Sequence, residues 1–317
     1  MAKNKIPSII KKIQEYKPTA VDYAFQKSIS YSQLSMFLSC PKKWSLQYKE
    51  GHKIPSFSIN MTFGTAVHET LQNYLSVMYN ESGVKADAIN IEEYFEERFR
   101  ENYAKGYKDN KNVHFSSPKE MREFYDDGLA ILDFIKKKRS EYFSLKDWHL
   151  VGIEMPIVIA PNKTHNNVLF NGFIDLVLYH EPTNQFIIYD IKTSTRGWKD
   201  KEKKDEVKQF QILLYKSFFS EQFGVDEENI DVEFFIVKRK IWEESEFPQK
   251  RIQQFNPANG KTKVKKAKTA LGTFIEETFN LDGSYKTVSH QATPSKWACA
   301  YCPYKLNKEL CNEAILK

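Results

Sequence analysis

The spacing of apolar residues divides the chain into a helical first half and a strand-rich second half. Apolar positions recur at helical spacing over 63–78, and again among charged residues over 88–145, with a polar break at 109–118. Residues 150–160, 168–180 and 185–193 are instead rich in Val, Ile, Phe and Leu, which predicts strands. A turn signal, Glu181-Pro182-Thr183-Asn184, lies between the last two of them.

The remaining segments complete a mixed pattern. We predict helices at 8–16, 207–222 and 271–279, a helix near Tyr31 with Ser32 as its N-cap, a strand at 231–241 and a basic loop at 256–268. The order is helices, three strands, helix, strand, helix and tail. It predicts an α/β (α+β) core with a central mixed sheet flanked by helices. We expect one domain over 1–317, with the 88–145 helices inserted before the sheet.

Composition supports a packed, globular chain. Of 317 residues, 41% are hydrophobic and 14% aromatic, and the net charge is +6, which suits a polyanionic partner without requiring one. No apolar run approaches the ~20 residues that cross a bilayer. The basic start, Met1–Lys5, is not followed by the apolar core of a signal peptide. We therefore expect a cytoplasmic protein without a membrane partner.

Two aspartates interrupt strands that otherwise read as buried. Asp175 stands in the second predicted strand and Asp190 in the third, with Lys192 two residues further on the same face. A turn centred on Pro182-Thr183 places Asp175 directly opposite Asp190, with Cβ atoms ~4.5–5.5 Å apart. Two carboxylates so close repel unless a cation lies between them, and oxygen ligands suit Mg²⁺ or Mn²⁺. The alternative is an Asp–Lys ion pair at a sheet edge.

These residues resemble a known family. Gly172-x-x-Asp175, Asp190-x-Lys192 and Gln211-x-x-x-Tyr215, preceded by His68 on a helix, resemble the signature of RecB-type PD-(D/E)XK nucleases. The resemblance covers roughly 31–80 and 150–311. It implies a restriction-endonuclease-like core and a Mg²⁺- or Mn²⁺-dependent deoxyribonuclease, an exonuclease that hydrolyses phosphodiester bonds by a two-metal mechanism.

The resemblance also assigns roles to single residues. His68, Asp175, Asp190 and the carbonyl of Ile191 would be metal ligands, and Lys192 the catalytic lysine. Gln211 would bind DNA or hold Lys192. Tyr215 would stack on a base or pack against the core. Glu154 recurs in similar proteins, with a structural or supporting role.

Four cysteines form a second candidate site. Cys299 and Cys302 form a Cys-x-x-Cys pair, Cys311 adds a third thiolate, and Cys40 supplies the fourth from far upstream. Four thiolates suit Zn²⁺ or an iron–sulfur cluster, and the spacing does not choose between them. One upstream and three C-terminal cysteines resemble the iron staple of AddB-type and CRISPR-associated RecB-like nucleases. That resemblance implies a 4Fe–4S cluster that closes the tail, 296–317, onto Cys40.

Basic and aromatic residues complete the predicted surface. Candidates for phosphate contact are Arg196 and the lysines that follow it, 238–240, and the lysines of 261–268, and candidates for stacking are Trp44, Trp198 and Trp242. Each run could equally be a solvated face. The expected partner is single-stranded DNA or a DNA end, within recombination, repair or phage DNA metabolism, beside a helicase or recombination protein. The oligomeric state stays open. The competing hypothesis is a catalytically silent or partner-activated DNA-binding scaffold of the same fold.

Overall fold

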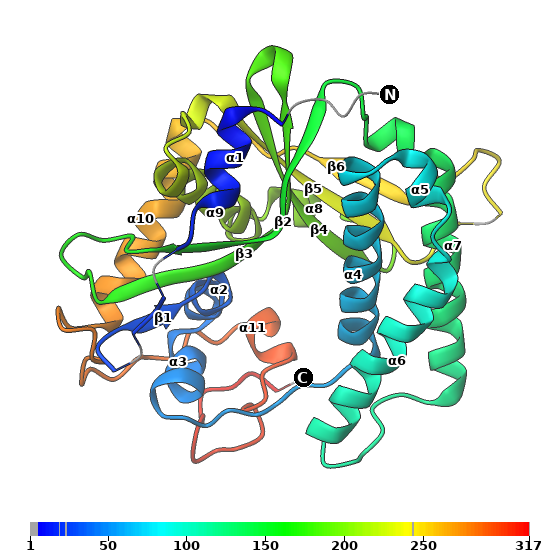
Figure 1. Ribbon diagram of the computed structural model, residues 1–317. Helices are drawn as coiled ribbons and strands as arrows, with labels where there is room; N and C mark the ends of the chain where they lie inside the picture. The colour runs from blue at the N-terminus through cyan, green and yellow to red at the C-terminus, as the bar shows by residue number, and fades with distance from the viewer. Residues whose placement is uncertain (1–5, 19, 23, 243, 317) are drawn as a thin grey trace.

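The computed structural model describes residues 6–18, 20–22, 24–242 and 244–316, and a mixed six-stranded sheet lies at its centre (Figure 1). The basic segment Met1–Lys5 lies outside the described residues. The strands are β1 (Lys27–Ile29), β2 (Trp148–Ile159), β3 (Val168–His180), β4 (Gln185–Ser194), β5 (Ile230–Lys238) and β6 (Ile252–Phe255). They lie in the order β1-β3-β4-β5-β6, with β2 paired to β3. Since β4 and β5 are parallel and their other neighbours antiparallel, the mixed sheet predicted from the sequence is confirmed.

The β3–β4 hairpin has the predicted register. Its pairs run from Leu176 opposite Tyr189 to His180 opposite Gln185. The turn is a short 3-10 segment, η2 (Glu181–Thr183), followed by Asn184 in the left-handed conformation with φ 52°. Asparagine tolerates that conformation well, so the turn residues fix the register.

One edge of β3 carries a gap in its pairing. The strand β2 pairs with the other edge from Phe170 to His180. On the gapped edge, β1 pairs with the first three residues of β3, and β4 pairs from Leu176 onward. Residues 171–175 of that edge therefore have no strand partner, and the backbone is open there to side chains and ligands.

Two layers of helices cover the sheet (Figure 1). One face carries α1 (Ser8–Glu15), α2 (Tyr31–Ser39), α9 (Glu206–Phe223) and α10 (Lys261–Thr278), which share one apolar core with it. The other carries α4 (Ile59–Asn80), α6 (Ile91–Asp109) and α7 (Pro118–Tyr142), with a second core. The short helical segments are α3 (Pro41–Trp44), a π-helix η1 (Ser45–Lys49), α5 (Gly83–Asp87), α8 (Asp200–Lys204), η3 (Glu227–Asn229) and α11 (Lys296–Ala300). Across the described ranges, no helix has the length and apolar character that a bilayer span requires.

Local signals explain where the long helices begin. The hydroxyl of Ser58 accepts from the amide of Met61 at the start of α4. Ser117 and Glu120 form a reciprocal capping box at α7, with Pro118 in the first turn. Asp205 caps α9 by accepting from two amides, and Gly224, with φ 67°, ends it.

Several expected elements were wrong in detail. The N-cap of α2 is Ser30 rather than Ser32. The basic segment expected to be a loop begins α10, because Val264, Ala267 and Leu271 form a buried face at helical spacing. The strand expected at 231–241 ends at Lys238, and the short strands β1 and β6 had no signal in the sequence.

Gly128 marks the closest packing between α6 and α7. A Cβ at this position would lie 2.2 Å from the Cζ atom of Phe95. Gly128→Ala is therefore expected to destabilise the fold by about 1–3 kcal/mol despite alanine's higher helix propensity. Gly272→Ala on α10 is the matched control, since its Cβ meets nothing within 4 Å and should stabilise by about 0.4–1 kcal/mol. Urea denaturation measures both, and equal effects would contradict this packing.

Candidate active site

The two aspartates face each other where β3 and β4 separate. Asp175 lies in the unpaired stretch of β3, one residue before the first β3–β4 pair. Its Oδ2 atom accepts a hydrogen bond of 2.6 Å from the amide of Ile191, which replaces the missing strand pairing. Asp190 precedes that amide on β4 and is 1% exposed. The pairing gap therefore sets two carboxylates side by side on one face.

Lys192 links this pair to α9. Its Nζ atom donates to Asp190 Oδ1 at 3.1 Å and to Gln211 Oε1 at 3.0 Å. The same ammonium lies 2.9 Å from Asp190 Oδ2, but that buried oxygen accepts no hydrogen bond. Asp190 is therefore held by an ion pair with Lys192 in which its Oδ2 accepts no well-aligned hydrogen bond.

His68 approaches from α4 on the other side of Asp175. Its Nδ1 atom lies 3.9 Å from Asp175 Oδ2. Burial, and then the charge of Lys192, lower the pKa of His68 to about 4, although a backbone hydrogen bond with Ile191 opposes the shift. His68 is therefore neutral at neutral pH, the form in which imidazole binds a metal.

The charges of the site are strongly coupled. Burial, and then the charge of Asp190, raise the pKa of Asp175 well above its usual range. Burial also raises the pKa of Asp190, against the effect of the Lys192 ammonium. For Lys192, burial favours the neutral amine, but Asp190 and Asp175 outweigh it and raise its pKa. The lysine thus stays protonated, and the aspartates gain from any further cation.

Gln211 and Tyr215 lie on the same side of α9 but differ in exposure to the site. Gln211 holds Lys192, as described above. Tyr215 is 6% exposed and packs edge-on against Phe170, with ring centroids 6.3 Å apart. A Cβ on Gly172 would lie 2.8 Å from its ring, so the glycine makes room for it. Stacking on a base needs an open ring face, which this buried ring does not offer.

Two further polar residues support the site, and sequence reasoning gave them little or no weight. Gln72 lies one helical turn after His68 and donates to Glu154 Oε1 at 2.6 Å and to the Asp175 carbonyl at 3.2 Å. Glu154 has φ 48° inside β2, a conformation that costs about 1–3 kcal/mol for such a residue. The i, i+4 spacing from His68 was the available signal for Gln72.

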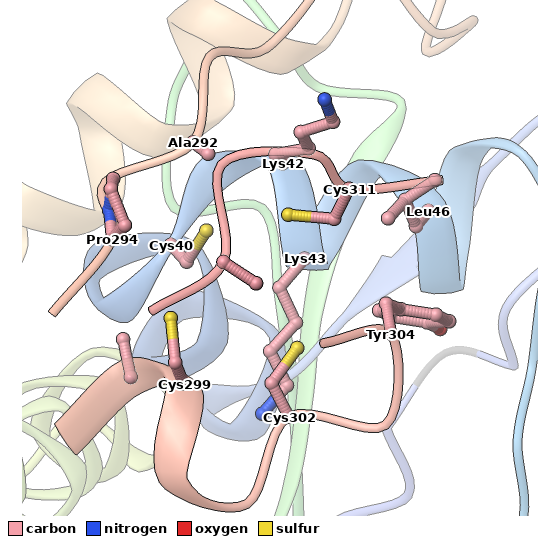
Figure 2. Close-up of a pocket in the computed structure, with 12 residues that line it drawn as sticks. Cys40, Lys42, Lys43, Leu46, Ala292, Pro294, Cys299, Cys302, Tyr304 and Cys311 are labelled. Atoms are coloured by element: carbon pink, nitrogen blue, oxygen red, sulfur yellow. The ribbon is translucent and has the colours of Figure 1, made fainter. Parts of the chain in front are cut away.

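The four cysteines line one cavity. It lies between the end of α2, α3 and the C-terminal tail, and the cysteine side chains point into it (Figure 2). Hydrogen bonds join the C-terminal tail to the upstream segment. Thr293 donates to the Ser39 carbonyl at 3.0 Å, and Tyr304 donates to the His52 carbonyl at 2.6 Å. Burial raises the pKa of the Cys302 thiol, and the neighbouring Cys311 and Cys40 add to this. Lys42 and Lys43 bring positive charge to the wall.

Most of the basic and aromatic candidates are engaged elsewhere. Trp44 is fully buried, and Trp198 packs against Phe234 with ring centroids 4.8 Å apart. Most lysines of α10 pair with acidic side chains: Lys261 with Glu228, Lys263 and Lys266 with Glu206, and Lys268 with Glu221. These contacts favour the alternative interpretation, in which the two tryptophans pack in the core and the lysines form a solvated face. Trp242, 70% exposed, stays available.

The donor set near Asp190 fits a divalent cation. Within the described part of the chain, no three His, Cys, Asp or Glu side chains already form a ready-made metal site. Even so, the carboxylates of Asp175 and Asp190, the carbonyl of Ile191 and neutral His68 provide the oxygen-rich set that Mg²⁺ or Mn²⁺ prefers. The Oδ2 atom of Asp190 accepts no hydrogen bond and lies 2.9 Å from the Lys192 ammonium, so a cation bound there would share the carboxylate with Lys192.

Comparison with known proteins places this geometry in a family. No curated protein matches the chain. Among 14 matching chains of solved structures is one from Eubacterium rectale described as a "putative exonuclease". It is 10% identical, with 95% of each chain covered and a TM-score of 0.49. The family model of the PD-(D/E)XK nuclease superfamily matches residues 28–311, which include the aspartates, the lysine and all four cysteines. The chain therefore belongs to the PD-(D/E)XK nuclease superfamily.

Proposed function

We propose that the protein is a Mg²⁺- or Mn²⁺-dependent deoxyribonuclease of the RecB-like branch, acting as an exonuclease. The observation that carries the proposal is the cluster of Asp175, Asp190 and Lys192, in which one buried and one partly buried carboxylate meet an ammonium at a gap in the sheet. A scaffold that only binds DNA has no need to bury these charges together, at a cost to stability. The superfamily match and the positive net charge support DNA as the substrate.

The residues have separate tasks in hydrolysis. Asp175, Asp190, His68 and the Ile191 carbonyl would hold the metal, with a second ion beside the first in the two-metal scheme. Bound there, the metal supplies Lewis-acid charge and a lowered pKa for a bound water. The water loses a proton to solvent as its oxygen bonds to phosphorus, the bond to the leaving oxygen breaks, and that oxygen takes up a proton from solvent. Lys192, kept protonated and aimed by Gln211, donates hydrogen bonds to the attacking water or to the charged phosphate oxygens.

The cysteine cavity is proposed to hold a 4Fe–4S cluster. The support is the convergence of all four cysteines on one cavity, together with the arrangement of one upstream and three C-terminal ligands. Lys43 would offset part of the negative charge of four thiolates. Zn²⁺ is the alternative occupant. The role is structural, because the cluster would join the tail, 296–317, to Cys40.

The whole chain, 1–317, is proposed to act as one nuclease domain in cytoplasmic DNA recombination, repair or phage DNA metabolism. The helical block at 88–145 would be an insertion that clamps DNA or docks a helicase or recombination partner. Its helices α6 and α7 pack on α4, the helix that carries His68. The oligomeric state is left open by this arrangement.

The proposal is tested with anaerobically purified protein. End-labelled single- and double-stranded linear DNA and a closed circle are incubated with Mg²⁺ or Mn²⁺. Shortening of the linear strands with the circle spared is expected, and the labelled end gives the polarity. Cleavage of the circle at the same rate would replace the exonuclease with an endonuclease. DNA binding without any cleavage would favour the scaffold hypothesis.

Metal binding predicts a pH-dependent stabilisation. Saturation with Mn²⁺ at about 100 times the dissociation constant should add about 2.7 kcal/mol to the free energy of unfolding. Without metal, the raised pKa of Asp175 means that the folded protein loses stability as pH rises from the ordinary aspartate range through that pKa. Protons and metal compete for the same carboxylate, so the stabilisation by Mn²⁺ should grow with pH over this window. Thermal melts check this, and an equal Mn²⁺ shift in Asp190→Asn would contradict the site.

A further inference from the structure

An open groove continues the active-site face of the sheet beyond the ends of β4 and β5. Its volume is about 770 Å³. It is lined by Arg196 after β4, by Lys238 at the end of β5, and by Lys240, Ile241, Trp242 and Gln249 of the connection to β6. Glu244 is the one carboxylate among the lining residues of the described chain. The lining thus combines cations with one exposed aromatic ring.

Strand register places the groove next to the catalytic lysine. In the parallel β4–β5 pair, Lys192 lies beside Ile236 and Ser194 beside Lys238. Alternation along the strands turns Lys238 to the same face as Lys192, about 8 Å away between Cα atoms. The amides of Arg239 and Lys240 donate to the carbonyls of Ser194 and Thr195 at 2.8 and 2.7 Å. The groove floor is therefore fixed to the strand that carries Asp190 and Lys192.

The cations at this floor lack acidic partners. In the ranges the structure describes, no carboxylate lies within ion-pair distance of Arg196 or Lys238. By contrast, Lys240 pairs with Glu123 and Asp127 at 3.0 and 2.9 Å. Burial, and then the charge of Arg251, lower the pKa of Lys238. Like charges held together without a counter-ion favour binding of an anion.

Trp242 differs from the other tryptophans. Trp44 and Trp198 pack in the core, Trp148 lies 4.7 Å from the His180 ring, and Trp297 lies under the Lys201 ammonium at 3.6 Å. Among the described residues, Trp242 has no ring or cation contact, although 70% of it is exposed. An indole face so placed can stack on a base whose own face is uncovered, as the bases of a single strand can be.

We propose that this groove binds single-stranded DNA on one side of the scissile phosphate, with Arg196 and Lys238 on its phosphates and Trp242 stacked on a base. The inference rests on the proposed nuclease function and adds the form of the substrate. Inside a duplex, both faces of each base are covered by the neighbouring base pairs, so no internal base offers a face to Trp242. The strand that leaves the catalytic residues would therefore already be separated from its complement.

Binding of a fluorescein-labelled oligothymidylate, measured by anisotropy in EDTA so that nothing is cut, tests the groove. Trp242→Ala is expected to weaken binding about 5- to 100-fold. Arg196→Gln and Lys238→Gln should each weaken it and reduce the slope of log affinity against log salt by about 0.7. Phe25→Ala, an equally exposed ring (74%) in the turn before β1, and Lys265→Gln on α10 are the matched controls, with no change expected.

The outcomes separate the groove from the nuclease function. If native protein binds the oligonucleotide and the three groove variants bind it equally well, the proposed role of the groove in DNA binding is wrong, and the nuclease proposal stands. Tighter binding of a fully paired duplex would overturn the single-strand assignment. If native protein neither binds nor cleaves DNA, the proposed function fails together with this inference. Unchanged melting temperatures of the variants confirm that they are folded.

Discussion

Lys192→Ala protein is expected to hydrolyse DNA about 100- to 1000-fold more slowly than the native protein. Among the residues that the structure describes, Lys192 is the cation that contacts Asp190, and its ammonium also donates to Gln211. Its loss removes the donor that faces the reacting phosphate, whereas the groove beyond β4 keeps its cations. DNA binding should therefore survive. Single-turnover rates with end-labelled DNA at saturating Mn²⁺ measure the effect.

Asp190→Asn is a second variant that should lose cleavage, for a different reason from Lys192→Ala. It keeps the shape of the side chain and removes the charge that would hold the metal, so cleavage should also be lost. Gln211→Ala should have a smaller effect, because Lys192 would keep its contact with Asp190. A Lys192→Ala protein with near-native rates would show that another group performs this task.

If the four cysteines hold the proposed iron–sulfur cluster, Cys302→Ser is expected to abolish it and to destabilise the protein by more than about 4 kcal/mol, as loss of a structural metal does. Cys302 lines the shared cavity, and its cluster would join two chain segments that few hydrogen bonds hold. Iron and sulfide content, visible absorption and thermal melts measure the change. Destabilisation should be accompanied by faster proteolysis of the tail.

Ala300→Ser is the control for the cysteine variant, since position 300 lies between Cys299 and Cys302 but does not line the cavity. It should keep the cluster and the native melting temperature. If the native protein is colourless and contains one zinc ion, the cysteine site holds Zn²⁺ and not an iron–sulfur cluster. A native protein with neither metal, and as stable as Cys302→Ser, would contradict the metal site.

The hairpin shows what the sequence could predict. Its turn residues and the position of each aspartate in an apolar strand were enough to derive the register that the structure has. Local signals of this kind act over a few residues and are therefore readable without a fold. The pairing gap in β3, by contrast, arises because β1 and β4 use the same edge, which only the assembled sheet shows.

The misread segments have physical reasons. Lysines dominate the first turns of α10, and the segment looked like a loop because only Val264 and Ala267 represent its buried face before residue 268. Lysine is a good helix former, so charge alone was a poor guide. The strands β1 and β6 are three and four residues long, too short for alternation to be visible.

The site was predictable as a set of residue types but not as a set of contacts. The motif residues His68, Asp175, Asp190, Lys192 and Gln211 do lie together. The support of Glu154 by Gln72 joins residues 82 positions apart. Nothing in the sequence marks the acidic residue Glu154 as one with a left-handed backbone. Such tertiary details come from packing around the site and lie outside local pattern.

We propose above all that DNA cleavage depends on a divalent cation held by Asp175 and Asp190. The most direct measurement is the cleavage rate of end-labelled linear single-stranded DNA, followed through a Mn²⁺ titration of EDTA-treated protein beside Asp190→Asn. We predict no cleavage without metal, a saturable rise for the native protein and none for the variant. Cleavage by the native protein that needs no metal, or equal cleavage by Asp190→Asn, would contradict the account.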